Sequence, residues 1–305
     1  FVAVISIILG MGLPTTANYI VVSSLMAGVV VELGAQSGLI VPLVAVHMFV
    51  FYFGIMADVT PPVGLASFAA AAISGGDPLK TGFQAFFYSI RTALLPFLFI
   101  FNTDLLLIDV GPVQAVFVFI VALIAMLLFA AGTMNYFIVK SRFYESAVLL
   151  LVAFTLFRPG YFLDQIAPEF ETRSASEMFA MAEAAPDDAN LRVRLTGENL
   201  NGEQIDAKYL LPLGAAGPDG VTRLLDGAGI EFRDEDGKFF VDNLNFGGPS
   251  EQLGIDWDWE VVELEVPANR LPKEIFYIPA LLLLGGVAFL QYRRKEAEEL
   301  QEAAV

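Results

Sequence analysis

Two long apolar stretches of this chain are each interrupted by residues that break a helix. The first stretch, residues 1–33, is broken at residues 10–18, which contain two glycines and a proline. The second, residues 39–73, is broken at residues 58–64, which contain an aspartate and two adjacent prolines. Lipid cannot hydrogen-bond the N–H and C=O groups that such breaks release, so they occur only where protein or water meets them. Paired breaks therefore point to the ion and substrate site of a transporter.

The composition places the chain among membrane proteins and predicts one water-exposed domain. Hydrophobic residues make up 56% of the sequence and the mean hydropathy is +0.64, yet the formal net charge is −17. Residues 159–272 hold 23 of the 34 acidic residues but only 8 of the 17 basic ones. This uneven distribution predicts an acidic soluble domain at residues 164–272 in an otherwise apolar, α-helical polytopic chain.

The first 110 residues predict a re-entrant hairpin followed by a discontinuous helix. The hairpin covers residues 1–31, and its arms at 1–9 and 18–31 are each shorter than the roughly 20 residues that cross a hydrocarbon core. The discontinuous helix is expected over residues 39–73.

The segment after the second break contains a helix start. Asp77 is suited to cap a helix that begins at Pro78. Residues 79–92 mix aromatic, polar and basic side chains, as in a helix at the membrane surface or in a connector. Residues 93–108 are apolar enough to lie buried against protein.

Three further transmembrane helices and the charges at their ends predict the topology. Two of them, at residues 113–139 and 146–157, fall within 111–163, and the last, at 275–292, falls within 273–305. Basic residues follow the first and the last of these spans, at Lys140, Arg142, Arg293, Arg294 and Lys295. Since positive charge favours the cytoplasmic side, the C-terminal tail is expected in the cytoplasm. The acidic domain is then extracytoplasmic, which in a bacterium is the periplasm.

The acidic domain predicts a β-rich fold. Its polar first part, residues 164–190, fits a short helix and a linker. Apolar runs separated by turns follow, and Asp236-Gly237 is a hairpin signal. The predicted strands are residues 191–195, 209–213, 229–233, 239–244 and 260–266.

The first break offers oxygen ligands for a cation. Gly10 and Gly12 open the helix, and Thr15, Thr16 and Asn18 place side-chain oxygens beside carbonyls released from it. Such oxygen clusters bind Na⁺ in transporters, while helix N-termini beside them favour an anionic substrate group. The alternative is a proline kink whose carbonyls are satisfied by the threonine hydroxyls.

The second break strengthens the prediction of a site. Asp58 lies within an apolar segment, where an ionisable group is costly and functional by default. Thr60 adds a hydroxyl, and Pro61 and Pro62 keep nearby carbonyls out of a helix because proline has no N–H. Gly64 ends the break.

Both breaks resemble the second half of the large membrane subunit of a TRAP transporter, in its TAXI-type fused form. The resemblance covers residues 1–108 and rests on the order and spacing of the runs 10–18, 21–26, 49–54 and 58–65. Gly28 departs from the family pattern, which has proline at that position.

The resemblance implies an inner-membrane permease, embedded in the lipid bilayer and driven by a Na⁺ gradient. A periplasmic substrate-binding protein would deliver a small organic anion, such as an organic acid or amino acid. The chain would be the second inverted repeat of an elevator-type fold, and its start at Phe1, within an apolar run, suggests that the first repeat precedes it. The Na⁺ and substrate region would comprise Gly10, Gly12, Thr15, Thr16, Asn18, Asp58, Thr60, Pro61 and Gly64.

The acidic domain carries a second resemblance, to a PDZ-like domain, with its core at about residues 225–267. The order of strand, DG turn, strand, short helix and strand is similar to that fold. Pro249-Ser250 and the run 256–259 depart from its usual motifs, so a domain that binds no peptide stays open as the alternative.

The remaining residues favour neither catalysis nor nucleic-acid binding. Cysteine is absent, no nucleophile and base occur in a catalytic pattern, and no cofactor is expected besides Na⁺ as the coupling ion. The acidic loop 234–237 fits a solvated turn, and the negative charge opposes nucleic-acid binding. His47, the only histidine, lies about three turns from Asp58 on one helix face. It is either a hydrogen-bonded packing residue or a proton-coupling group.

Two other functions fit parts of this pattern. The helices could anchor a scaffold or binding protein whose extracytoplasmic β-domain recruits a partner. A channel would share the broken helices but would need neither a binding protein nor a Na⁺ gradient.

Overall fold

The chain folds into two compact units. The computed structural model describes residues 1–108, 110–199 and 202–302, so the last three residues of the predicted cytoplasmic tail lie outside the described residues. One unit is helical and contains Phe1–Gly28, Pro42–Ala167 and the chain from Leu271 onward. The other contains Pro168–Arg270 together with Val29–Val41. Each unit is described by itself.

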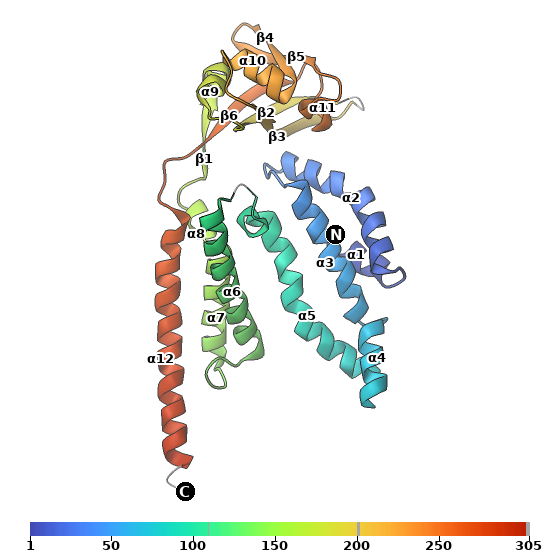
Figure 1. The fold of residues 1–305 in the computed structure, drawn as a ribbon, viewed down its shortest axis with the longest axis vertical. Helices are drawn as coiled ribbons and strands as arrows, with labels where there is room; N and C mark the ends of the chain where they lie inside the picture. Colours follow the sequence, from blue (N-terminus) through green and yellow to red (C-terminus); the bar gives the residue numbers. More distant parts are fainter. Residues whose placement is uncertain (109, 200–201, 303–305) are drawn as a thin grey trace. The chain divides into compact units, whose positions relative to one another are not determined.

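The first helices of the helical unit are interrupted at both predicted breaks (Figure 1). Helix α1, Val2–Gly10, ends at the first break, and α2, Thr15–Gln36, begins after it. Helix α3, Leu43–Met56, leads into a 3₁₀ turn, η1, at Ala57–Val59. Helix α4, Leu65–Ser74, resumes after the second break, so the predicted discontinuous helix is confirmed.

The second arm of the predicted hairpin is longer than the sequence suggested. We expected residues 18–31, but α2 has 22 residues and is long and apolar enough to span a membrane. Gly28 and Gly34 do not end it, because a glycine inside a helix costs only about 1 kcal/mol. The helix ends where the Leu39 N–H donates to the Gly34 carbonyl at 2.8 Å and Gly38 adopts φ +75°.

Helix α5, Pro78–Phe101, corrects the expectation of two separate segments at 79–92 and 93–108. It is one 24-residue helix with Pro96 inside it. The predicted cap is confirmed, since the Asp77 carboxylate accepts from the Lys80 N–H at 2.9 Å. The 3₁₀ turn η2, Thr103–Leu106, follows.

Three helices form the rest of this unit. Helix α6, Pro112–Met134, and α12, Tyr277–Glu302, both pack near α7, Phe143–Phe157 (Figure 1). The 3₁₀ turn η5, Lys273–Phe276, precedes α12, and the short helix α8, Gly160–Asp164, follows α7. Their shared core is mostly aliphatic and includes Ala125, Leu128, Leu149, Val152, Ala153, Leu156, Phe157, Ala280 and Val287. In the described part of the chain, four helical segments have spanning length and hydropathy, namely α2, α5, α6 and Lys273–Leu300.

A buried polar cluster joins α7 to α12. Glu145 is only 1% exposed, and its carboxylate accepts from Arg294 at 2.9 and 3.0 Å and from Gln291 at 2.8 Å. Arg294 also donates to the Lys140 carbonyl at 3.0 Å. The two basic segments that the sequence placed on one side of the membrane therefore lie at the same end of this helix bundle.

The second unit is built on a six-stranded antiparallel sheet with the order β3-β2-β6-β5-β4, in which β1 also pairs with β6. The strands are β1 Phe170–Ser174, β2 Asn190–Glu198, β3 Gln204–Pro212, β4 Ile230–Glu235, β5 Lys238–Leu244 and β6 Glu260–Pro267. Alternate residues of β2 and β3 are buried, as expected for a sheet with one face on the core. The Asp236-Gly237 turn is confirmed, with φ values of 55° and 83° that suit a type I′ hairpin.

One strand of this unit was not predicted. Strand β1 lies in the segment assigned to a helix and linker, and its mostly exposed residues carry no alternating pattern that would indicate a strand. Strands β1 to β3 share one sheet with β4 to β6, so the PDZ-like core of about 225–267 would be only part of this sheet. The predicted helix in the same segment is present as α9, Met178–Ala184. The PDZ-like resemblance stays a prediction.

Short helices complete the second unit. They are η3 Ala175–Glu177, α10 Gly220–Arg223, the π-helical turn η4 Leu224–Ala228, and α11 Pro249–Gln252. Arg223 is 1% exposed and donates to four carbonyl oxygens, those of Ala182, Ala185, Pro186 and Gly214. This buried guanidinium fixes the segment that follows α9 against α10.

Candidate ion and substrate site

The two breaks meet at glycines. Gly10, the last residue of α1, faces α3 so closely that a Cβ built on it would lie 2.6 Å from the Ala57 Cβ and 3.0 Å from the Gly54 carbonyl oxygen. Real Cβ atoms essentially never approach another atom to 2.6 Å. Glycine at position 10 therefore lets the end of α1 touch the backbone just before Asp58.

Asn18 joins this contact from the first turn of α2. Its side chain is fully buried, and its Nδ2 donates to the Ser6 carbonyl at 3.0 Å. The same nitrogen would lie 2.8 Å from a Cβ on either Gly10 or Gly54. Asn18 therefore fills the space that the two glycines leave open between α1 and α3.

The Asn18 Oδ1 atom is buried and has no hydrogen-bond partner in the described part of the chain. A buried acceptor without a donor costs roughly 1–3 kcal/mol, and its site is normally completed by a ligand, an ion or water. A neutral amide oxygen is a good ligand for a hard cation, because its partial negative charge is compact. The geometry therefore favours cation binding beside this atom.

The second break presents further oxygens. The Thr60 hydroxyl donates to the Met56 carbonyl at 2.6 Å, which leaves its lone pairs available. Gly64 has φ +34°, and the Ser67 hydroxyl donates to its carbonyl at 2.8 Å. Asp58 is half-buried, and no basic group among the described residues pairs with its carboxylate.

The structure brings only some of the predicted site residues together. Gly10 and Asn18 lie against α3 immediately before the second break. Gly12 and Thr16 are exposed at the turn, and Thr15 is half-buried beside them. Pro61 instead faces α5, since a Cβ on Gly82 would lie 3.1 Å from its Cγ. The central contact is therefore smaller than the predicted set.

Four contact residues were missed by the sequence analysis. Ser6 supplies the carbonyl that holds Asn18, and its own hydroxyl donates to the Val2 carbonyl at 2.9 Å. Gly54 and Gly82 are small residues that face the breaks. Their signal was a glycine within a helix, in the apolar run 49–54 for Gly54 and in the mixed segment 79–92 for Gly82. Tyr19 was also missed; its hydroxyl lies 3.0 Å from the His47 Nδ1, so the histidine has a hydrogen-bond partner.

The chemistry of this region is that of neutral oxygens and one carboxylate. No cluster of three or more His, Cys, Asp or Glu side chains able to hold a metal ion occurs among the described residues. A cation here would be held by amide, hydroxyl and carbonyl oxygens, with Asp58 as the nearby negative charge. This donor set suits a monovalent ion such as Na⁺.

Comparison with known protein families separates the chain into two parts. Residues 115–297 match the family described as Domain of unknown function (DUF3394). The chain belongs to the DUF3394 family. Residues 1–114, which contain both breaks, match the family described as Tripartite ATP-independent periplasmic transporter, DctM component. No curated protein and no solved structure matches the chain.

The DctM match gives the part with the breaks a function class. DctM is a transporter component and not an enzyme, and the match indicates a TRAP transporter permease component. Such components sit in a membrane and work with a substrate-binding protein and a small DctQ subunit. The match ends at residue 114, close to the start of α6, so the remaining helices and the sheet domain belong to the DUF3394 part.

The glycine contact makes a direct stability prediction. Gly10→Ala is expected to lower the melting temperature of the detergent-solubilised protein by several degrees, because the new methyl group overlaps Ala57 and Asn18. Gly28→Ala is the matched control, since nothing lies within 4 Å of its Cβ position in α2. It is expected to leave stability unchanged or to raise it slightly, as alanine favours a helix. Equal melting temperatures for the two variants would contradict the contact.

Proposed function

We propose that this chain is part of the permease of a Na⁺-driven, binding-protein-dependent transporter that imports a small organic anion. The observation that carries the proposal is the buried, unpartnered Asn18 Oδ1 at the place where the hairpin break meets the broken helix. The DctM match supplies the transporter class. The order and spacing of both breaks support the TAXI-type variant.

The two helix starts beside the breaks support an anionic substrate. Helix α2 begins at Thr15 and α4 begins at Leu65. The first N–H groups of a helix lack partners within it and carry a partial positive charge. Together with a bound cation, they would attract the carboxylate of an organic or amino acid. The substrate-binding protein would deliver this anion.

A cation between the breaks would couple the ion gradient to transport. With Na⁺ bound, the end of α1 and the start of the second break would both coordinate the same ion. The hairpin and the broken helix would then move as a rigid body. Without Na⁺, the Asn18 oxygen is unsatisfied and the loop arrangement that accepts the substrate loses stability. Such movement corresponds to the elevator-type mechanism that the sequence predicts.

A second candidate function rests on the open edge of the sheet. Strand β4 is the last strand in the order β3-β2-β6-β5-β4, so its outer edge has no partner strand among the described residues. An extended peptide could add there, as in PDZ-like domains, which would suit a membrane-anchored scaffold. Na⁺-driven uptake by the permease would favour transport over this alternative.

The sodium site is tested by substrate uptake into proteoliposomes that contain the complete transporter, in the presence of its binding protein. Asn18→Leu keeps the side-chain size but removes the oxygen, and we expect it to raise the Na⁺ concentration for half-maximal uptake roughly tenfold, since a contact with a charged group is worth about 1.5–3 kcal/mol. Asp58→Asn and Thr60→Val are expected to abolish Na⁺-driven uptake. Ser24→Ala, which removes an exposed hydroxyl of α2, is the control.

Each variant must first give a monodisperse, membrane-inserted protein, so that lost uptake is not lost folding. Normal uptake by Asp58→Asn and Thr60→Val at limiting Na⁺ would eliminate the sodium assignment. Uptake that is equally fast without a Na⁺ gradient and without the binding protein would instead indicate a channel.

We also propose that the sheet domain is periplasmic and the end of α12 cytoplasmic in a bacterial inner membrane. The support is the shared position of the basic segments around Lys140 and Arg294 at one end of the α6–α7–α12 bundle. The chain has no cysteine, so Phe246→Cys, at a side chain that is 98% exposed, should react with an impermeant maleimide from outside. Glu299→Cys should react only after permeabilisation, and the reverse pattern would overturn the orientation.

A further inference from the structure

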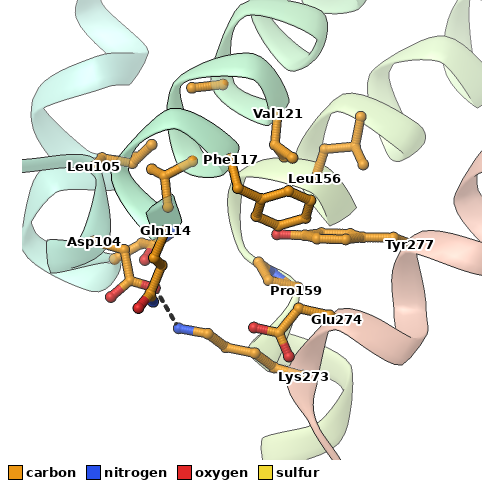
Figure 2. Close-up of a pocket in the computed structure, with 13 residues that line it drawn as sticks. Asp104, Leu105, Gln114, Phe117, Val121, Leu156, Pro159, Lys273, Glu274 and Tyr277 are labelled. Carbon is orange, nitrogen blue, oxygen red and sulfur yellow. Dashed lines mark hydrogen bonds and ion pairs between the residues drawn. The ribbon is translucent and has the colours of Figure 1, made fainter. Parts of the chain in front are cut away.

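A pocket of about 230 Å³ lies where several helices of the helical unit end. It is bordered by the C-terminal ends of α5 and α7 and by the N-terminal ends of α6 and α12 (Figure 2). Asp104 and Gln114 come from the part that matches DctM, and Lys273 and Tyr277 come from the DUF3394 part. The pocket is therefore built at the junction of the two matched families.

The inner wall of the pocket is apolar. Phe117, Val121 and Leu156 line it, and the Phe117 ring lies 6.2 Å from the Tyr277 ring, centroid to centroid (Figure 2). Gln114 and Val121 are seven residues apart on α6, which is about 10 Å along a helix. The wall thus extends from a polar rim toward the apolar middle of a helix that is long enough to span a membrane.

The rim of the pocket carries charge of both signs. Lys273 Nζ lies 2.6 Å from the Asp104 carboxylate, and the two side chains are 35% and 24% exposed. Glu274 is exposed next to them, and no hydrogen bond or ion pair to its carboxylate occurs within the described residues. The three groups leave one negative charge without a counter-charge at the rim.

The helix ends set the depth of this rim in a membrane. Helices α5 and α6 and the segment Lys273–Leu300 are each of spanning length, and they contribute their ends, not their middles, to the rim. The charged groups therefore lie at the level of the membrane–water interface, with the apolar wall on the hydrocarbon side. A charged rim above an apolar wall matches an amphiphilic molecule that is aligned with the bilayer.

We infer that this pocket binds a phospholipid whose headgroup carries a primary ammonium, as in phosphatidylethanolamine. The Lys273 ammonium has three donors and uses one on Asp104, so it can also donate to the lipid phosphate. The Glu274 carboxylate accepts from the lipid ammonium and so gains its missing counter-charge. The pocket is smaller than a whole lipid, so it holds the headgroup region and the start of one chain, and the rest lies along exposed residues on the same stripe of α6, Phe117 and Ile124.

This lipid would link the segment that matches DctM to the segment that matches DUF3394. Its phosphate would contact Lys273, which is already paired with Asp104 across the junction, and its chain would contact α6 and α7. The site lies apart from the breaks and does not depend on the sodium proposal. If the lipid inference fails, the sodium proposal is unaffected, and the reverse also holds.

Native mass spectrometry of the delipidated protein tests the inference. Phosphatidylethanolamine and phosphatidylglycerol are titrated separately, and we expect one phosphatidylethanolamine per chain at concentrations where phosphatidylglycerol, which has no ammonium, does not bind. Glu274→Gln should weaken this binding roughly tenfold, because it removes a charge-assisted hydrogen bond. Ala122→Phe, which fills the pocket beside the apolar wall, should also weaken phosphatidylethanolamine binding.

Glu296→Gln is the matched control, since it removes the same charge from an exposed position near the other end of α12, and it should bind phosphatidylethanolamine as the unmodified chain does. Glu274 is at the surface, so its replacement is not expected to affect folding. Equal binding of the two lipids, or unchanged phosphatidylethanolamine binding by Glu274→Gln, would overturn the inference.

Discussion

A helix that breaks inside a membrane must find partners for its released backbone groups within the protein, and this requirement organises the first part of the chain. The ends of α1 and α3 meet at Gly10 and Gly54 at a distance that excludes a methyl group. Asn18 fills the remaining space but leaves its own oxygen unsatisfied. The sodium ion that we propose would complete this contact by binding the Asn18 oxygen.

The other polar contacts of the helical unit lie at the two ends of the bundle that contains α6, α7 and α12. Glu145, Gln291 and Arg294 join α7 to α12 at one end of the bundle. Asp104 and Lys273 join η2 to the start of α12 at the other end. Buried or half-buried charges of this kind are stabilising only when paired, so they fix helices that apolar packing alone would allow to slide.

The sequence predicted the features that depend on backbone chemistry. Glycine and proline cause the breaks at 10–18 and 58–64, and Asp77 caps the start of a helix. Each of these residues acts on the backbone next to it and needs no tertiary contact to do so. The true length of α2 and the continuity of α5 were missed, since a helix can continue through glycine at a small cost and α5 also accommodates Pro96. Strand β1 was missed because its pairing with β6 uses the backbone and needs no apolar pattern. The contact of Asn18 with Gly54 depends on which helices are neighbours, which one sequence does not reveal.

The central claim is that both breaks form one sodium site. Hydrogen–deuterium exchange of the purified protein, in Na⁺ and in K⁺ at equal ionic strength, tests it without requiring transport or a known substrate. We expect Na⁺ to slow exchange at residues 10–18 and 57–64 together, with one shared Na⁺ dependence, and Asn18→Leu to weaken protection at both. Protection at neither segment, or at one segment alone, would contradict a site shared by the hairpin and the broken helix.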